Sequence, residues 1–100
     1  MVGYIYIDTP EKLASESKKW TSDLGIDLEC ENNLHHFGEY IAIIQISNGK
    51  EHWVVDVLVL DDIKPVIRML ESTKIQKIFH DCNFDLRILD KQFGCKPKNI

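Results

Sequence analysis

The stretch that decides the fold is residues 40–57, which read YIAIIQISNGKEHWVVDV. Its first half, 40–47, is too densely apolar for a strand with one solvated side, so it predicts a strand at the centre of a sheet, buried on both faces. Asn48 and Gly49 are typical of a tight hairpin turn, because both tolerate the left-handed backbone that such turns need. A second strand is expected around 52–57. Residues 40–57 therefore predict an antiparallel strand pair within a larger sheet.

The elements before this pair are less regular. Residues 4–7, YIYI, are β-branched and aromatic and predict a short strand. Thr9 and Pro10 suit the N-cap and the first helical position, so a partly exposed helix over one sheet face is expected to run to about Trp20. Residues 24–29 predict the next strand.

The elements after the pair alternate helix and strand. Asp61 or Asp62 can cap a helix whose apolar residues follow the i, i+3, i+4, i+7 rule. A strand over 74–80 and a last helix, ended by Gly94 and Pro97, complete the order β-α-β-β-β-α-β-α. The expected fold is α/β, with three antiparallel strands and then a helix crossover to a parallel strand. The apolar positions of the two helices are Ile63, Val66, Ile67 and Leu70, then Phe84, Leu86, Ile88, Leu89 and Phe93.

Composition limits the class of protein. A chain of 100 residues with 44% hydrophobic content can form one domain with one core. The net charge is −4, and the first 50 residues carry 8 acidic against 4 basic side chains. This balance argues against a protein that holds nucleic acid mainly by attraction to phosphates, because counterion release needs Lys and Arg.

The cysteines and the apolar runs indicate a compartment. Cys30, Cys82 and Cys95 are odd in number and form no C-x-x-C pair, so neither a disulfide framework nor a zinc ribbon is implied. The longest apolar run is far too short to cross a membrane. We therefore expect a cytoplasmic protein in a reducing setting.

Two acids on the 24–29 strand are the first candidates for chemistry. Ile26 and Leu28 face one side of this strand, and Asp27 and Glu29 face the other. Their Cα atoms lie roughly 6 to 7 Å apart, and hard oxygen ligands of this kind suit Mg²⁺ or Mn²⁺. A solvated pair on an edge strand explains the pattern equally well.

A second group of polar residues lies at 79–85, FHDCNFD, where the last strand meets the last helix. Asp81 and Asp85 are four apart and share one face of a first helical turn. Asp81 is also a credible N-cap, and an acid at Asp85 is favoured by the helix dipole. The position of Asp85 beside the C-terminal end of a strand is nevertheless where α/β sheets usually bind ligands.

Together these motifs resemble the ribonuclease D branch of the DEDD 3′-5′ exonucleases, which have a ribonuclease H-like fold. The resemblance runs from Tyr4 to Ile100, with its first motif at 26–29 and its second at 79–86. It implies that Asp27, Glu29 and Asp85 are three of four metal-binding carboxylates in a two-ion site that hydrolyses phosphodiesters.

The resemblance also implies substrate contacts. Leu28 and Cys30 look like positions that approach the terminal nucleotide, and Phe84 looks like a residue that supports it by packing. Asp81 is also expected to bind substrate. Leu28 is more simply explained as a core residue. The implied partner is the single-stranded 3′ end of RNA or DNA, and the sequence leaves the choice between the two open.

The family's third motif supplies a fourth Asp and a Tyr or His, and residues 1–100 contain no match to it. We therefore expect the N-terminal part of an exonuclease domain, incomplete at its C-terminus, with an uncovered apolar sheet region and little or no activity by itself. The alternatives are a non-catalytic remnant of the same fold and a module that associates with a second copy.

The remaining polar residues carry weaker predictions. The four histidines lack any zinc-ligand spacing, and His80 is expected to be a structural hydrogen-bonding residue near the site. Arg87 and Lys91 are candidates for contact with substrate phosphates, although lysines and arginines on helices are usually solvated.

Overall fold

The computed structural model describes residues 3–32, 39–80 and 82–100. The elements are, in chain order, β1 (Ile5–Ile7), α1 (Pro10–Ser17), β2 (Leu24–Asn32), β3 (Glu39–Ser47), β4 (His52–Asp56), α2 (Lys64–Glu71), β5 (Lys77–Phe79) and α3 (Cys82–Phe93). The predicted order of strands and helices is confirmed. Within the described part of the chain, no helix has the length and apolar character needed to cross a membrane.

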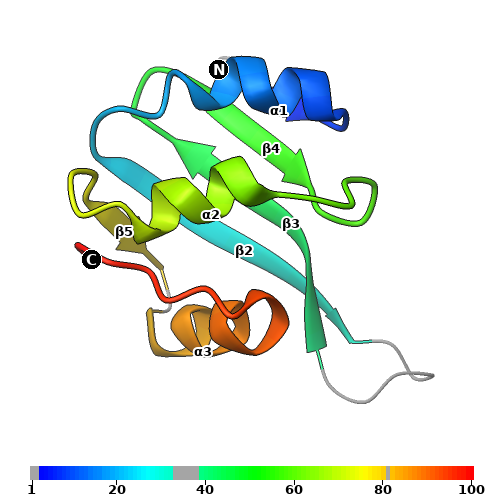
Figure 1. Cartoon of the computed structure of the whole chain (residues 1–100), viewed down its shortest axis with the longest axis vertical. Helices are drawn as coiled ribbons and strands as arrows, with labels where there is room; N and C mark the ends of the chain where they lie inside the picture. The colour runs from blue at the N-terminus through cyan, green and yellow to red at the C-terminus, as the bar shows by residue number, and fades with distance from the viewer. Residues whose placement is uncertain (1–2, 33–38, 81) are drawn as a thin grey trace.

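The five strands form one mixed sheet in the order β1-β4-β3-β2-β5. Strands β2, β3 and β4 are antiparallel, β5 pairs with β2 in parallel, and β1 pairs with β4 in parallel. Helix α2 crosses over the sheet and connects β4 to β5. Strand β5 lies next to β2, on the side away from β3 (Figure 1). The predicted α/β fold, with antiparallel strands followed by a crossover to a parallel strand, is confirmed.

The core lies between the sheet and the three helices, which all lie on one face of the sheet (Figure 1). Ile44, Trp53, Leu70 and Leu89 are fully buried there. Trp20, which follows α1, meets Trp53 edge to face with ring centroids 5.9 Å apart. Aromatic pairs of this kind add to the free energy that their burial contributes.

The hairpin between β3 and β4 forms as predicted. The Asn48 side chain accepts hydrogen bonds from the backbone N–H groups of Lys50 and Glu51 at 2.9 and 2.7 Å. Gly49 has a φ of 92°, which side chains with a Cβ rarely adopt. The turn sets the register in which Ser47 pairs with His52, and it therefore decides which side chains of β3 and β4 share a face.

The prediction that β3 is buried on both faces is wrong. Its position at the centre of the sheet is confirmed, but Ile43 and Gln45 are only half-buried. They belong to the side of the sheet on which Tyr6, Val54, Gln45 and Asp27 form one row across four strands, as the register shows. We name this side the open face. No helix among residues 3–32, 39–80 and 82–100 covers it, so a dense apolar run here does not mean two packed layers.

The helix ends differ slightly from expectation. Helix α1 begins as predicted, with the Thr9 side chain accepting from the Lys12 backbone at 3.2 Å, but it ends at Ser17, short of Trp20. Helix α2 has Ile63 as its N-cap, which corrects the prediction of Asp61 or Asp62. Asp62 still accepts from the backbone N–H of Lys64 at 2.9 Å, so an acid does satisfy one of the helix's first N–H groups.

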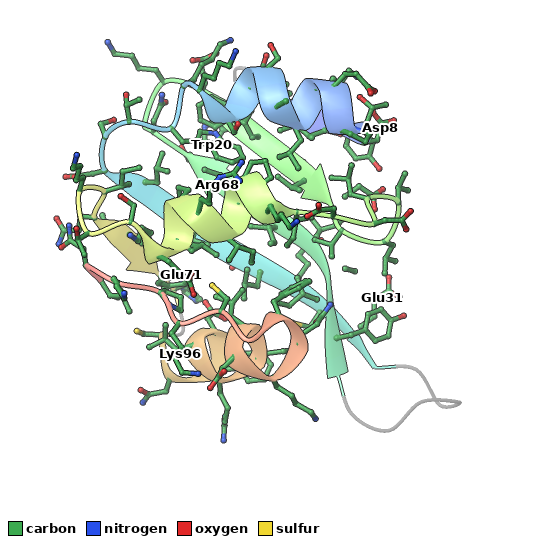
Figure 2. All side chains as sticks on the ribbon, in the orientation of Figure 1. Asp8, Trp20, Glu31, Arg68, Glu71 and Lys96 are labelled. Atoms are coloured by element: carbon green, nitrogen blue, oxygen red, sulfur yellow. The ribbon has the colours of Figure 1, made fainter. Side chains whose placement is uncertain are left out.

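The segment after α3 fixes the neighbouring elements in place. It runs back along α2, where the backbone N–H of Lys96 donates to Glu71 at 2.9 Å and that of Lys98 to the Leu70 carbonyl at 2.9 Å (Figure 2). The backbone N–H of Lys77 in β5 donates to the Asn99 carbonyl at 2.9 Å. This segment therefore ties β5, which leads into α3, to the rest of the core.

Candidate active site

Asp27 and Glu29 lie together on the open face, as the alternation of β2 predicts. Ile26, the residue before Asp27, is only 3% exposed and faces the covered side of the sheet, whereas both acids are exposed. Strand β5 pairs with β2 up to Ile26, so Asp27 follows at the level where this parallel neighbour ends. The carboxyl ends of parallel strands are where α/β sheets bind ligands. β2 lies between β3 and β5 in the strand order, but β5 pairs with it only over 24–26, so at Asp27 and Glu29 a solvated pair of acids also fits the sheet.

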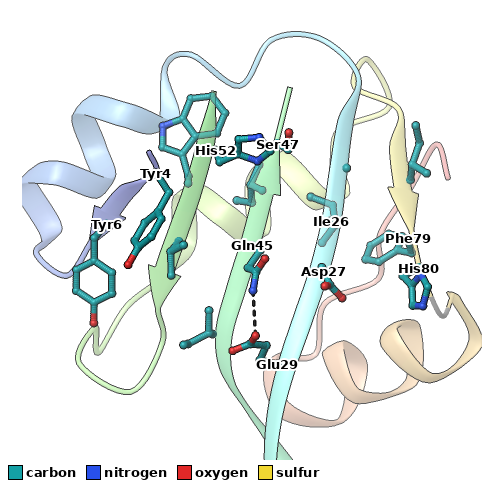
Figure 3. A pocket seen from close by; sticks show the side chains of 16 residues that line it. Tyr4, Tyr6, Ile26, Asp27, Glu29, Gln45, Ser47, His52, Phe79 and His80 are labelled. Carbon is teal, nitrogen blue, oxygen red and sulfur yellow. Dashed lines mark hydrogen bonds between the residues drawn. The ribbon is translucent and has the colours of Figure 1, made fainter. Parts of the chain in front are cut away.

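Gln45 is a site residue that the sequence did not reveal. Its side-chain Nε2 donates a hydrogen bond to Glu29 Oε1 at 3.0 Å (Figure 3). In the sheet it pairs with Asp27 on one side and Val54 on the other. A polar residue inside the apolar run of 40–47 was the available signal, but its partner could be known only from the register of β3 against β2.

The open face is hollowed into a cleft of about 990 Å³ to which all five strands contribute. Asp27 and Glu29 lie on one part of it, and Tyr4 and Tyr6 lie across β4 and β3 from them (Figure 3). Tyr4 is 60% exposed. Neither Lys nor Arg occurs among the described residues that line the cleft.

Tyr6 makes a polar contact at the far end of this cleft. Its hydroxyl donates to Asp56 Oδ2, and this hydrogen bond is the main cause that raises the pKa of Tyr6 to about 12. The phenol is therefore protonated throughout the physiological range. Its one O–H already donates to Asp56, and the phenol adds no negative charge to the cleft.

Asp85 is buried and does not line the cleft. It is 4% exposed, in the first turn of α3, and it is not among the described residues that line the cleft. Residues 3–32, 39–80 and 82–100 contain no group of three His, Cys, Asp or Glu side chains placed to hold a metal ion. The structure therefore unites Asp27 with Glu29, while the convergence of Asp85 on them stays a prediction.

The predicted substrate contacts have mostly core neighbours. Leu28, Cys30 and Phe84 are partly buried and pack against the hydrophobic core. This supports the simpler explanation of Leu28 as a core residue, and their contact with a nucleotide stays a prediction. Asp81 lies outside the described residues, as do both its expected roles.

The histidines and the basic candidates divide in the same way. His80 lines the cleft next to the end of β5, close to Asp27 in the view of Figure 3, and His52 lines it on β4. His35 and His36 lie outside the described residues. Arg87 and Lys91 are exposed on α3 and are not among the cleft residues, so their contact with phosphates stays a prediction.

The donor set on the open face fits a hard divalent cation. Asp27 and Glu29 offer carboxylate oxygens, the ligand type that Mg²⁺ and Mn²⁺ prefer. Mg²⁺ is usually held by one or two carboxylates together with substrate phosphates, and it does not require a complete cage of protein ligands. Two exposed carboxylates at a cleft wide enough for a ligand meet that requirement.

Comparison with known proteins assigns the chain to a family. Residues 4–100 match the family model described as 3′-5′ exonuclease. The match covers nearly the whole chain, so the chain belongs to the 3′-5′ exonuclease family.

Within that class the chain is similar to ribonuclease D. It is 25% identical to ribonuclease D of Pseudomonas paraeruginosa over 93 residues, which is 92% of this chain and 25% of that protein. It is 30% identical to ribonuclease D of Desulfotalea psychrophila over 78 residues, 77% of this chain and 21% of that protein. The chain thus spans about a quarter of the length of these relatives.

Solved structures agree with this assignment. The crystal structure of Trypanosoma brucei ribonuclease D superposes with a TM-score of 0.82 at 28% identity, covering 96% of this chain and 36% of that one. Escherichia coli ribonuclease D gives a TM-score of 0.82 at 24% identity, over 96% of this chain and 26% of that one, which supports the fold. The predicted resemblance to ribonuclease D is confirmed.

Proposed function

We propose that this chain is the metal-binding part of an exonuclease that removes nucleotides from the 3′ end of RNA or DNA. The observation that carries the proposal is the pair of exposed carboxylates, Asp27 and Glu29, beside the carboxyl end of β5, the kind of position where α/β sheets usually bind ligands. Membership of the 3′-5′ exonuclease family supports the reaction class. The aromatic and apolar lining of the cleft supports a ligand with planar, partly apolar groups such as nucleobases.

The proposal assigns Asp27, Glu29 and Asp85 as ligands of Mg²⁺ or Mn²⁺. When bound, two such ions supply Lewis-acid stabilisation of the phosphate and of the leaving 3′ oxygen. Asp27 and Glu29 present their oxygens on the open face, where a phosphate can approach. Asp85 belongs to a neighbouring part of the fold. β5 lies beside β2, and α3, which carries Asp85, begins directly after β5. We propose that Asp85, in the first turn of α3, joins the pair when an ion binds.

The proposal includes weak or absent hydrolysis by these 100 residues by themselves. The family resemblance assigns a fourth Asp and a Tyr or His to a third motif, and residues 1–100 contain no match to it. Three carboxylates hold a second ion less firmly than four. Binding of the ion and of the 3′ end is therefore the primary property to test, and turnover is the secondary one.

Single-stranded RNA is the first substrate to test. Trypanosoma brucei ribonuclease D, in its complex with RNA U12, superposes with a TM-score of 0.80 at 28% identity. We propose by this similarity that the cleft takes the 3′ end of RNA, with Leu28, Cys30, Asp81 and Phe84 near the terminal nucleotide. DNA is the comparison substrate, since contacts to the 2′-hydroxyl decide between the two.

The test combines ion binding with RNA binding. Mn²⁺ is expected to raise the Tm of the wild-type chain, and Asp27→Asn and Glu29→Gln are expected to remove that rise. Asp23→Asn is the matched control, because Asp23 is an exposed acid just before β2 and is not among the cleft residues. Fluorescence anisotropy then compares a labelled RNA that has a free 3′ hydroxyl with the same RNA blocked by a 3′ phosphate.

Specific outcomes decide the proposal. Mn²⁺-dependent binding that prefers the free 3′ hydroxyl and is lost in Asp27→Asn supports it. Absence of any Mn²⁺ effect on Tm, or an effect unchanged in both site variants, overturns it. Shortening of the labelled RNA from an internal position shows a different nuclease activity and also contradicts it.

A self-associating module is the second candidate function, and one observation favours it. The open face exposes apolar surface, with Tyr4 and Ile78 each 60% exposed. Exposed apolar patches on a sheet often mark an interface. Light scattering separates the two candidates: a dimer dispersed by Ile78→Lys supports association through the open face, whereas a monomer across the working concentration range contradicts it.

A further inference from the structure

Gln45 occupies a place where an apolar residue is expected. It lies in the middle of β3, the central strand, between the buried Ile44 and Ile46, and it is half-buried. Its neighbours on the open face include Val54, the residue opposite it on β4. Burying part of an amide costs free energy unless the amide finds a hydrogen-bond partner. The sheet would be served as well by Val or Ile here, so the amide's partner is the feature to explain.

That partner is Glu29. Gln45 pairs directly with Asp27, and Glu29 is two residues further along β2, on the same face. Diagonal neighbours of this kind across antiparallel strands lie within reach of long side chains. The Nε2 of Gln45 uses this reach and donates to Glu29 Oε1 at 3.0 Å (Figure 3). The Gln45 side chain therefore lies beside Asp27 and hydrogen-bonds to Glu29.

The chemical type of this donor matters. A hydrogen bond from an amide restricts the rotamer of the Glu29 carboxylate and leaves its negative charge intact. A Lys or Arg in the same place would also fix the rotamer, but its positive charge would repel a divalent cation. The bond occupies Oε1, so Oε2 is left for a further ligand. A neutral donor at position 45 thus prepares a carboxylate to bind a cation.

We propose that Gln45 is a positioning residue that holds the Glu29 carboxylate in the orientation that binds the divalent ion. This inference rests on the proposed function, and in it Gln45 acts on the ion through Glu29. Groups that hydrogen-bond to metal ligands typically change metal affinity by about 10- to 100-fold when removed. A loss in that range is expected here, without loss of the fold.

The decisive variant is Gln45→Met, which keeps the length of the side chain and removes the donor. Its matched control is Gln76→Met, at an exposed glutamine in the loop before β5. The readout is the concentration of Mn²⁺ that gives half of the maximal rise in Tm. We expect this concentration to increase by about 10- to 100-fold in Gln45→Met. The ion-free Tm of Gln45→Met is expected to stay at or above the wild-type value, since Met suits a sheet surface.

A second measurement does not depend on the ion. In the ion-free chain, the NMR resonances of the Gln45 side-chain amide are expected to shift on Glu29→Ala, while those of Gln76 stay in place. If Gln45→Met fails to fold, Gln45→Asn replaces it, because Asn keeps the amide but is too short to reach Glu29. The ion-affinity loss is then expected in Gln45→Asn.

The outcomes separate this inference from the proposed function. Wild-type binding of Mn²⁺ with an affinity within about twofold in Gln45→Met and Gln45→Asn overturns the positioning role alone, since the expected change is tenfold or more. A wild-type chain that shows no Mn²⁺ effect overturns the proposed function and the positioning role together. An unshifted Gln45 amide in Glu29→Ala overturns the hydrogen bond on which the role depends.

Discussion

Replacement of Asp27 by Asn is predicted to change stability in opposite directions without and with a divalent ion. Positions two apart on a strand have Cα atoms about 6.5 Å apart, so Asp27 and Glu29 repel each other on the open face. At that separation two unit charges in a water-like dielectric repel by about 0.6 kcal/mol. Asn removes one charge at nearly constant volume. The ion-free chain is therefore expected to gain up to about 3 °C in Tm, the shift that this free energy gives in a domain of this size.

The same substitution removes the effect of the ion. A ligand at 100 times its Kd stabilises the folded state by about 2.7 kcal/mol. For a domain of this length this corresponds to a rise in Tm of about 10 to 20 °C. Wild type is expected to show this rise with saturating Mn²⁺, and Asp27→Asn is expected to lose most of it. A residue that destabilises the empty fold and stabilises the loaded one is the signature of a functional site.

Thermal melts followed by circular dichroism measure both effects. Ion-free melts are recorded in a chelator at low salt and again at about 1 M salt, where a Debye length of about 3 Å screens the repulsion and the gain is expected to vanish. Asp23→Asn serves as the control in each condition. An ion-free loss of more than about 1 kcal/mol in Asp27→Asn, a typical value for a lost structural contact, refutes the reasoning. A rise with Mn²⁺ equal to that of wild type refutes it as well.

Three further predictions follow from other contacts. The indole N–H of Trp53 donates to Glu16 at 2.9 Å and lowers the pKa of that carboxyl. The carboxylate therefore adds stability above the ordinary pKa of 4.5, and this stability is lost as pH falls through the pKa of Glu16 in the folded chain. Glu16→Gln is expected to cost about 1 kcal/mol at pH 7 and nothing once Glu16 is protonated, as measured by urea unfolding. Burial lowers the pKa of Lys77 in the folded chain below the ordinary value of 10.5. Between the folded and the unfolded pKa the unfolded chain binds more protons, so the free energy of unfolding rises with pH in that range. This rise is expected in wild type and not in Lys77→Met. RNA binding, followed by anisotropy, is expected to require Mn²⁺, and equal affinity in a chelator contradicts this.

The sequence predicted most of the fold because its local signals agree. Alternation along 24–29 gave the correct faces for Asp27 and Ile26, and the Asn48-Gly49 turn gave the correct hairpin. These features depend on neighbours close in the chain, where side-chain period and turn geometry are sufficient. The order of elements then followed from the same local rules.

What the sequence could not supply depends on contacts between distant residues. The hydrogen bond of Gln45 to Glu29 requires the register of β3 against β2, and no residue near position 45 encodes that register by itself. The half-buried state of Ile43 depends on whether a layer covers the open face. The placement of Asp85 depends on how the first turn of α3 is rotated, which the spacing of acids does not determine.

The charge of the open face limits how it can hold a nucleic acid. Two carboxylates lie in the cleft, and no Lys or Arg occurs among its described lining residues. The whole chain carries a net charge of −4, and the described cleft residues offer no Lys or Arg side chains to attract phosphates and release their counterions. Two bound divalent ions would change the local charge of the Asp27 and Glu29 pair from about −2 to about +2, which makes the ions the largest charges in the cleft. Under the proposed function, affinity for a phosphate therefore depends on the same ions as hydrolysis. We therefore expect the ion-free cleft to repel nucleic acid, so that the proposed binding and reaction both depend on one pair of carboxylates.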